Sequence, residues 1–229
     1  MTGTLALVGG GEFTDGCADL DRMLLERAGS TEVVVLPTAR AYEHPDRVVD
    51  DATKWFEALG ATVRGVRVLR RTDAESVDAV ASVRDASFIY LTDGSPLHLR
   101  SVLKESSLFA ALRAAFDGGA VVAASGAGAT VLCDPMVDPR GGAYTVGLGV
   151  VRGLAVFPYH GTAADHLRAR SSELLPANAI LAGIDERTAL VRERAGDWYA
   201  VGPGSVALSA RDGSIGSFRA EPIGALSGL

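Results

Sequence analysis

The chain has 229 residues, of which 48% are hydrophobic and 22% are charged, a composition typical of a globular protein and one that argues against long disordered tracts. Its formal net charge of -6 weighs against nonspecific binding to nucleic acid or to anionic lipid surfaces. No apolar run approaches the roughly 20 residues that a membrane span needs, and the opening segment lacks the features of a secretion signal, so we expect no membrane partner, no nucleic-acid partner and a cytoplasmic location.

The two cysteines, Cys17 and Cys133, lie far apart in the sequence. No CxxC pair or His/Cys cluster accompanies them, so they do not indicate a zinc site. We expect both to be free and buried as small apolar residues, with a disulfide between them as the alternative. The sequence predicts neither a metal nor a cofactor.

Short apolar runs alternate with helical patterns through the first two thirds of the chain. The runs expected to form strands are residues 5–9, 33–37, 62–69, 87–92 and 120–124. Apolar residues have helical spacing at 48–59 and 108–116, and residues 90–103 read as strand, turn and helix. This alternation predicts a mostly parallel sheet with helices on both faces.

The pattern changes after residue 133. Residues 134–142 form a loop rich in Pro, Gly and Asp, followed by a turn and strand at 147–158 and a helix at 163–174. Four further strands are expected at 179–183, 188–193, 197–202 and 205–210, joined by glycine-containing turns that favour an antiparallel edge. With no linker or repeat, residues 1–229 are expected to form a single domain containing one mixed sheet.

Residues 121–132 are a strand that runs into a tight turn of small residues and then into a helix. This order is typical of a nucleophile elbow, in which small residues allow close backbone packing and the start of the helix offers N–H donors to an oxyanion. The alternative is that the small residues only allow the strand and helix to pack closely or to bind an anion.

A glycine-rich turn at residues 7–12 follows the first expected strand. Ligands of open α/β sheets bind at the carboxyl edge of the strands, so Gly10 and Gly11 are candidates for substrate binding. A nucleotide phosphate loop is a weaker alternative, because the spacing of neither GxGxxG nor a Walker motif is present.

The candidates for a base and its orienting acid lie downstream. His160 follows an expected strand, and Asp185 and Glu186 lie in a turn before the strand at 188–193. A histidine in a loop usually has no catalytic role, but a nucleophile, a histidine and an acid in this order favour a triad.

Together these segments resemble the cyanophycinase and dipeptidase E family of serine peptidases. The matching segments are GGGE (9–12), LPTA (36–39), YLTDG (90–94), SGAGATVL (125–132) and GIDERTALV (183–191). The resemblance implies the class I glutamine amidotransferase-like fold: three α/β/α layers around a mostly parallel sheet with an antiparallel C-terminal edge. It also implies hydrolysis of an amide bond by serine, histidine and glutamate.

The resemblance puts Gly126 at the position of the family's serine, where glycine has no side chain to attack with. The neighbouring Ser125 fits an elbow pattern in a register shifted by one residue, which would reverse the direction in which the side chain leaves the strand. Amide hydrolysis is therefore expected to be impaired or repurposed.

The other site residues follow from the same match. Glu186 aligns with the family's acid, whereas the histidine position falls on His160 or, with the register set from Pro158 and Thr162, on Tyr159. The resemblance implies that the oxyanion donors are the amides of Gly94 and Ala127. Ser95 and Arg168 are candidates for substrate binding, although an arginine there also suits a solvated helix face.

Two functions remain open from the sequence. One is a serine hydrolase with Ser125 as nucleophile, His160 as base and Glu186 as its orienting acid. The other is a noncatalytic or repurposed protein whose pocket binds a small acidic or peptide-like ligand, or a biosynthetic enzyme that uses the same pocket for a chemistry needing only His160, Glu186 and the helix-end donors. The expected partner is a small peptide or an amino-acid-derived ligand, and a homodimer stays an alternative.

Overall fold

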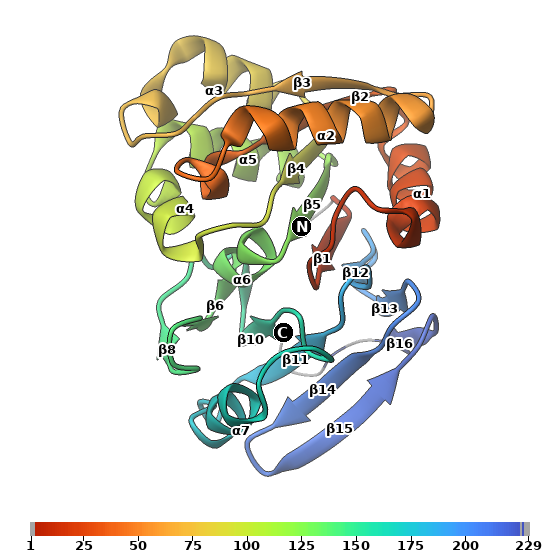
Figure 1. Ribbon diagram of the computed structural model, residues 1–229, viewed down its shortest axis with the longest axis vertical. Coiled ribbons are helices and arrows are strands. Elements are labelled where there is room, and N and C mark those ends of the chain that lie inside the picture. Colours follow the sequence, from red (N-terminus) through yellow and green to blue (C-terminus); the bar gives the residue numbers. More distant parts are fainter. Residues whose placement is uncertain (1–2, 225, 227–229) are drawn as a thin grey trace.

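A computed structural model describes residues 3–224 and 226 (Figure 1). The main sheet contains β1 (Leu5–Val8), β2 (Glu32–Leu36), β3 (Thr62–Gly65), β4 (Phe88–Leu91), β5 (Val121–Ser125), β12 (Ala189–Arg192), β13 (Trp198–Val201) and β16 (Pro222–Gly224). Its eight strands have the order β16-β13-β12-β1-β5-β4-β2-β3. The strands from β1 to β3 in this order are parallel, whereas β12, β13 and β16 are antiparallel.

The strands of the parallel half are apolar almost throughout. The side chains of β1, β4 and β5 are all buried, which is the pattern of strands that are covered on both faces. The predicted strands at 5–9, 33–37, 87–92 and 120–124 are confirmed. The predicted strand at 62–69 is shorter than expected, because β3 is the edge strand and its residues are mostly exposed.

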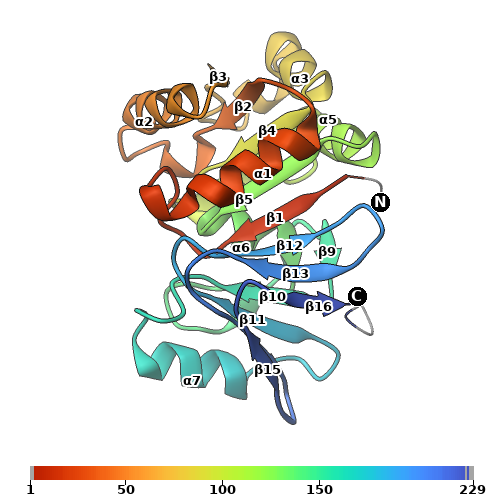
Figure 2. The same ribbon diagram turned by 90° about the vertical axis from the view of Figure 1, so that its right-hand side faces the viewer.

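Helices cover both faces of the main sheet. They are α1 (Ala18–Ala28), α2 (Pro45–Ala58), α3 (Val77–Arg84), α4 (Pro96–Leu103), α5 (Ser107–Asp117) and α6 (Ala127–Leu132), with short 3-10 helices η1 (Asp15–Cys17), η2 (Thr38–Arg40) and η3 (Asp73–Glu75). A further helix, α7 (Asp165–Glu173), packs on a small separate core. Side chains of α1 and α2 form a core with one face of the sheet, and α3 to α6 form a core with the other. Figure 2 shows α1 in front of β1 and β5. The predicted three-layer α/β/α architecture is confirmed.

A second sheet lies below the main one in Figure 1. It contains β10 (Leu154–Phe157), β11 (Ile180–Ile184), β14 (Val206–Ala210) and β15 (Gly213–Phe218), in the order β10-β11-β14-β15. Two small pairs join β6 (Cys133–Asp134) to β9 (Val151–Arg152) and β7 (Met136–Val137) to β8 (Tyr144–Thr145).

The prediction of one mixed sheet is wrong for part of the C-terminal third. Only β12, β13 and β16 extend the main sheet, while the segments expected at 179–183 and 205–210 pair with each other in the second sheet. Ala182, Val206 and Leu208 enter the core shared with α3 to α6, whereas Ala179 and Leu181 pack in a small separate core. Alternating apolar residues identify a strand with one buried face but do not identify the sheet that it joins.

Cys17 and Cys133 are both free and buried, as expected. Burial and the charge of the neighbouring Asp21 raise the pKa of the Cys17 thiol to about 12, so this thiol stays protonated at neutral pH. Within residues 3–224 and 226, no helix has the length and apolar character that crossing a membrane would take.

Candidate active site

A one-residue turn at Gly126 connects β5 to α6 at the carboxyl end of the parallel strands. Gly126 has φ 47° and ψ -105°, a backbone conformation that residues with a side chain rarely adopt. The turn is held by Thr130, whose amide and Oγ1 both donate to the Gly126 carbonyl, at 3.0 and 2.9 Å. Glycine at this position therefore avoids the strain that another residue would bear.

The carboxylate of Asp93, which follows β4, lies against this turn. Its Oδ1 accepts a hydrogen bond of 2.7 Å from the Ala127 amide, and Tyr159 Oη donates to its Oδ2. A Cβ placed on Gly126 would overlap Asp93 Oδ1 and Cγ and would lie 2.8 Å from Oδ2. The Asp93 carboxylate thus occupies the volume where a side chain at residue 126 would begin, and it holds the Ala127 amide that was expected to stabilise an oxyanion.

The loop after Asp93 is packed closely against η2. Gly94 has φ 142°, and a Cβ there would overlap the carbonyl of Ala39. The Ser95 amide donates to that carbonyl at 2.8 Å, and Ser95 Oγ accepts from the His98 amide at the start of α4, at 3.3 Å. Ser95 therefore caps α4 in this structure, and Gly94 lines the pocket described below.

Tyr159 reaches this site from the loop after β10. Its φ is 55°, its amide donates to the Gly9 carbonyl at 2.8 Å, and a Cβ on Gly10 would overlap its ring. Burial, followed by the charge of Asp93 and the hydrogen bond to it, raises the pKa of the Tyr159 phenol well above its usual range. Tyr159 is therefore a neutral donor to Asp93, and Gly10 provides space for its ring.

Ser125 lies on the side of the sheet that faces α1 and α2. It is fully buried, and its Oγ donates to Glu12 Oε2 at 2.7 Å. The other oxygen of Glu12 accepts from the Asp93 amide at 3.0 Å. The Ser125 hydroxyl is bonded to a carboxylate and not to an imidazole.

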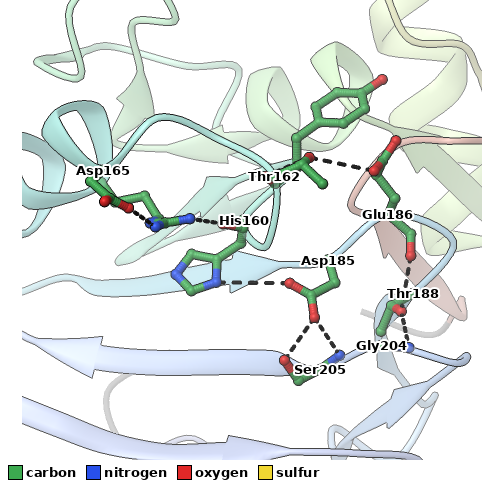
Figure 3. A network of polar contacts seen from close by, with 10 residues as sticks. His160, Thr162, Asp165, Asp185, Glu186, Thr188, Gly204 and Ser205 are labelled. Carbon is green, nitrogen blue, oxygen red and sulfur yellow. Dashed lines mark hydrogen bonds and ion pairs between the residues drawn. The ribbon is translucent and has the colours of Figure 1, made fainter.

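His160 lies in the loop after β10, and its ring packs over β11 of the second sheet (Figure 3). Its Nδ1 is 3.8 Å from Asp185 Oδ1, and its ring covers Gly183 of β11 so closely that a Cβ on that residue would overlap it. Asp185 in turn accepts from the amide and the hydroxyl of Ser205, at 2.9 and 2.8 Å. Burial is the largest influence on the imidazole and lowers the pKa of His160.

Glu186 points away from His160 in Figure 3. Its Oε2 accepts a long hydrogen bond of 3.4 Å from Thr162 Oγ1, and its Cβ lies beside Gly11. Among the contacts of residues 3–224 and 226, no hydrogen bond joins any two of Ser125, His160 and Glu186. The three candidates for a triad are therefore not assembled as one.

The guanidinium of Arg168, in α7, bonds to groups close to it in the sequence. Its Nη1 donates to the His160 carbonyl at 2.5 Å, and its Nη2 pairs with Asp165. Arg168 does not line the pocket beside Gly126. In this structure its guanidinium stabilises the loop that carries His160.

A pocket of about 250 Å³ opens beside the turn. Its lining residues are Asp93, Gly94, Pro96, Ala127, Thr130, Val137, Asp138, Pro139, Gly142, Phe157, Pro158, Tyr159, Ala163 and Leu167. On its other side, Tyr159 borders a wider groove of about 820 Å³ between η1 and α2. The described residues contain no cluster of three His, Cys, Asp or Glu side chains that could hold a metal ion.

Comparison with known proteins identifies the family. The family model for peptidase family S51 matches residues 5–195. The chain belongs to peptidase family S51. S51 relatives include the cyanophycinase of Nostoc sp., which is 28% identical over 218 residues that cover 88% of this chain and 72% of the relative. The cyanophycinase of Synechococcus elongatus is 26% identical over 224 residues, covering 90% of this chain and 67% of that protein.

A solved structure supports the same fold. The crystal structure of a peptidase from an acI-B1 Actinobacterium superposes with a TM-score of 0.88, is 28% identical, and covers 98% of this chain and 97% of that one. The predicted resemblance and the predicted fold class are both confirmed.

Sequence reasoning missed Asp93 and Glu12 as members of the site. Both carboxylates follow strands of the parallel half, Asp93 after β4 and Glu12 after β1, so their position at the carboxyl edge was a usable signal. Both also lie inside segments that carried the family resemblance, at YLTDG and GGGE. The missing information was that these carboxylates meet at residues 125–127.

Proposed function

We propose that this S51 family member binds a small ligand in the pocket beside Gly126 and does not hydrolyse amides through a serine nucleophile. The observation that carries the proposal is the position of the Asp93 carboxylate. It lies where a side chain at residue 126 would begin, and it accepts the hydrogen bond of the Ala127 amide. Acyl transfer requires an attacking group and free oxyanion donors; here residue 126 has no side chain to attack with, and one of the two expected donors, the Ala127 amide, is already bonded to Asp93.

The burial of Ser125 supports the same proposal. The residue is fully buried and lines neither the pocket nor the wider groove, so a substrate carbonyl has no path to its Oγ. A nucleophile must come within about 3–3.5 Å of the carbon that it attacks. Ser125 is better explained as a buried hydrogen-bond donor that orients Glu12.

One observation favours a second candidate function. The hydrogen bond of 2.7 Å between Ser125 Oγ and Glu12 is the kind of contact through which a carboxylate could activate a serine, and the relatives named above are a peptidase and cyanophycinases. A hydrolase of this type would need Asp93 to leave Ala127 and the loop at Asp93 to open a path to Ser125.

A fluorophosphonate probe distinguishes the two functions, because it forms a covalent bond with an activated serine. We expect no labelling of the wild-type protein, measured by intact mass, since Ser125 is inaccessible. Ser125→Ala is the matched control, because any labelling that persists in it arises elsewhere. Labelling of the wild type that Ser125→Ala abolishes would establish the hydrolase and end the proposal.

A further inference from the structure

The pocket beside Gly126 contains acidic groups and no basic ones. Its described lining includes the carboxylates of Asp93 and Asp138, whereas no Lys, Arg or His side chain lines it. Charged ligands are recognised by groups of the opposite charge, and like charges in a site of low dielectric repel strongly. The lining therefore selects against an anion.

Asp93 forms no ion pair with any described residue. The Arg40 guanidinium acts electrostatically on Tyr159, but it lies in the wider groove and pairs with Glu43. Asp93 is only 9% exposed, and its two side-chain hydrogen bonds come from uncharged donors, the Ala127 amide and Tyr159 Oη. Among the described residues, no cationic side chain forms an ion pair with Asp93 or with the neighbouring Glu12. A buried carboxylate without a counter-charge is costly, and two hydrogen bonds leave part of its accepting capacity free. A cation in the pocket would offset that cost.

Asp138, the second carboxylate of the lining, already forms an ion pair with Arg140. Arg140 Nε and Nη2 donate to it at 3.0 and 2.6 Å, and the Arg140 amide donates as well, which lowers the pKa of the Asp138 carboxyl. A cationic ligand would therefore gain more from Asp93 than from Asp138.

The rest of the pocket lining is mostly apolar. Pro96, Val137, Phe157 and Leu167 contribute to it, and Tyr159 presents its aromatic ring next to Asp93. The one threonine of the lining, Thr130, already uses its hydroxyl as a donor to a backbone carbonyl. Such walls suit a hydrocarbon body, and aromatic rings also attract a nearby ammonium group.

We propose that the ligand of this pocket is a small organic cation, a primary amine whose ammonium group binds Asp93 and whose apolar body packs along Phe157 and Leu167. The inference rests on the proposed function, because it takes the pocket as a binding site. The cavity of about 250 Å³ is smaller than the roughly 300–1,000 Å³ of drug-sized sites, which limits the ligand to a small molecule. The acidic ligand expected from the sequence does not match this lining, since its carboxylate would face Asp93.

Three ligands of similar shape test the charge that the pocket selects. They are phenethylamine, phenethyl alcohol and hydrocinnamate, which at neutral pH are a cation, a neutral molecule and an anion. Titration calorimetry with the wild-type protein is expected to show that the amine binds about 10- to 100-fold more tightly than the alcohol, with the anion weakest. This comparison needs no variant.

Two variants then locate the selecting group. Asp93→Asn keeps an acceptor for the Ala127 amide but removes the charge, and it should abolish the preference for the amine over the alcohol. Asp138→Asn is the matched control and should change the amine affinity by less than about threefold, because its charge is already paired. Circular dichroism of both variants verifies folding.

Equal binding of the three ligands, tighter binding of the anion, or no binding of the amine at about 10 mM would each overturn the proposal. A preference for the amine that survives Asp93→Asn would overturn the role of Asp93. None of these results changes the outcome of fluorophosphonate labelling, so failure of the ligand class and failure of the proposed function are distinguishable.

Discussion

Gly126→Ser is expected to destabilise the protein without restoring peptidase activity. The new Cβ would overlap Asp93 Oδ1 and Cγ, and residue 126 would carry a side chain at φ 47°. Overpacking and backbone strain of this kind lower the free energy of unfolding by about 3 kcal/mol together. Urea unfolding measures the loss. The proposed function predicts no peptidase activity in this variant, because Asp93 holds the Ala127 amide and Tyr159 lies beside the turn.

A second substitution tests whether Asp93 is the cause. Asp93→Ala removes the carboxylate from the volume next to residue 126, so the double variant should lose less stability than the sum of the two single variants, with a coupling of about 1–3 kcal/mol. Gly141→Ser is the matched control. A Cβ on Gly141 meets no atom within 4 Å, and its substitution should change stability by at most about 0.5 kcal/mol. A Gly126→Ser protein as stable as the wild type would show that the Asp93 carboxylate does not exclude a side chain at residue 126.

The free energy of unfolding is expected to fall as pH rises from about 4 to about 7, because of Asp21 in α1. Asp21 is fully buried; its Oδ2 accepts from Trp55 Nε1 at 2.8 Å, and its Oδ1 has no hydrogen-bond partner among the described residues. Burial is the main cause that raises the pKa of its carboxyl from 3.8 to about 7. The folded state then binds a proton that the unfolded state has already released, so stability present at pH 4 is lost as pH rises through 7.

Asp21→Asn should remove this pH dependence. Because a tenfold difference in proton affinity between the folded and unfolded states corresponds to about 1.4 kcal/mol, the wild type would lose up to about 4 kcal/mol relative to the variant between these limits. Chemical unfolding of both proteins at pH 4 and pH 8 measures the difference. The lowered pKa of His160 has the opposite effect but is common to both proteins. Asp19→Asn is the matched control on the same helix, where the side chain is 99% exposed. A stability difference between Asp21→Asn and the wild type that is the same at both pH values would contradict the prediction.

Much of the main sheet could be predicted because its strands are buried on both faces. Runs such as residues 5–9 and 120–124 are apolar throughout, and they alternate with helical segments, so local pattern was sufficient. The helix α1 was not predicted. The sequence also could not predict which sheet each strand after residue 178 joins, because strand pairing depends on residues that are distant in the sequence.

The candidate site, like the fold, could be predicted from the sequence only in part. The small residues at 121–132 predicted a strand, a turn and a helix, and the structure has β5, Gly126 and α6 there. The sequence could not tell whether Ser125, His160 and Glu186 meet. In the structure, His160 lies beside Asp185 and Ser125 bonds to Glu12, and each of these contacts joins segments that are distant in the sequence.

The sequence by itself determined the family, the parallel half of the sheet and the absence of a side chain at residue 126, since these depend on residue type and on local periodicity. Only the tertiary structure decided which group takes the vacant volume. Asp93, Tyr159 and Glu12 come from three separate loops that meet at the carboxyl edge of the sheet, and their contact depends on the order of the strands. The turn at Gly126 is formed by residues adjacent in the sequence, whereas the Asp93 carboxylate that lies against it comes from a distant loop.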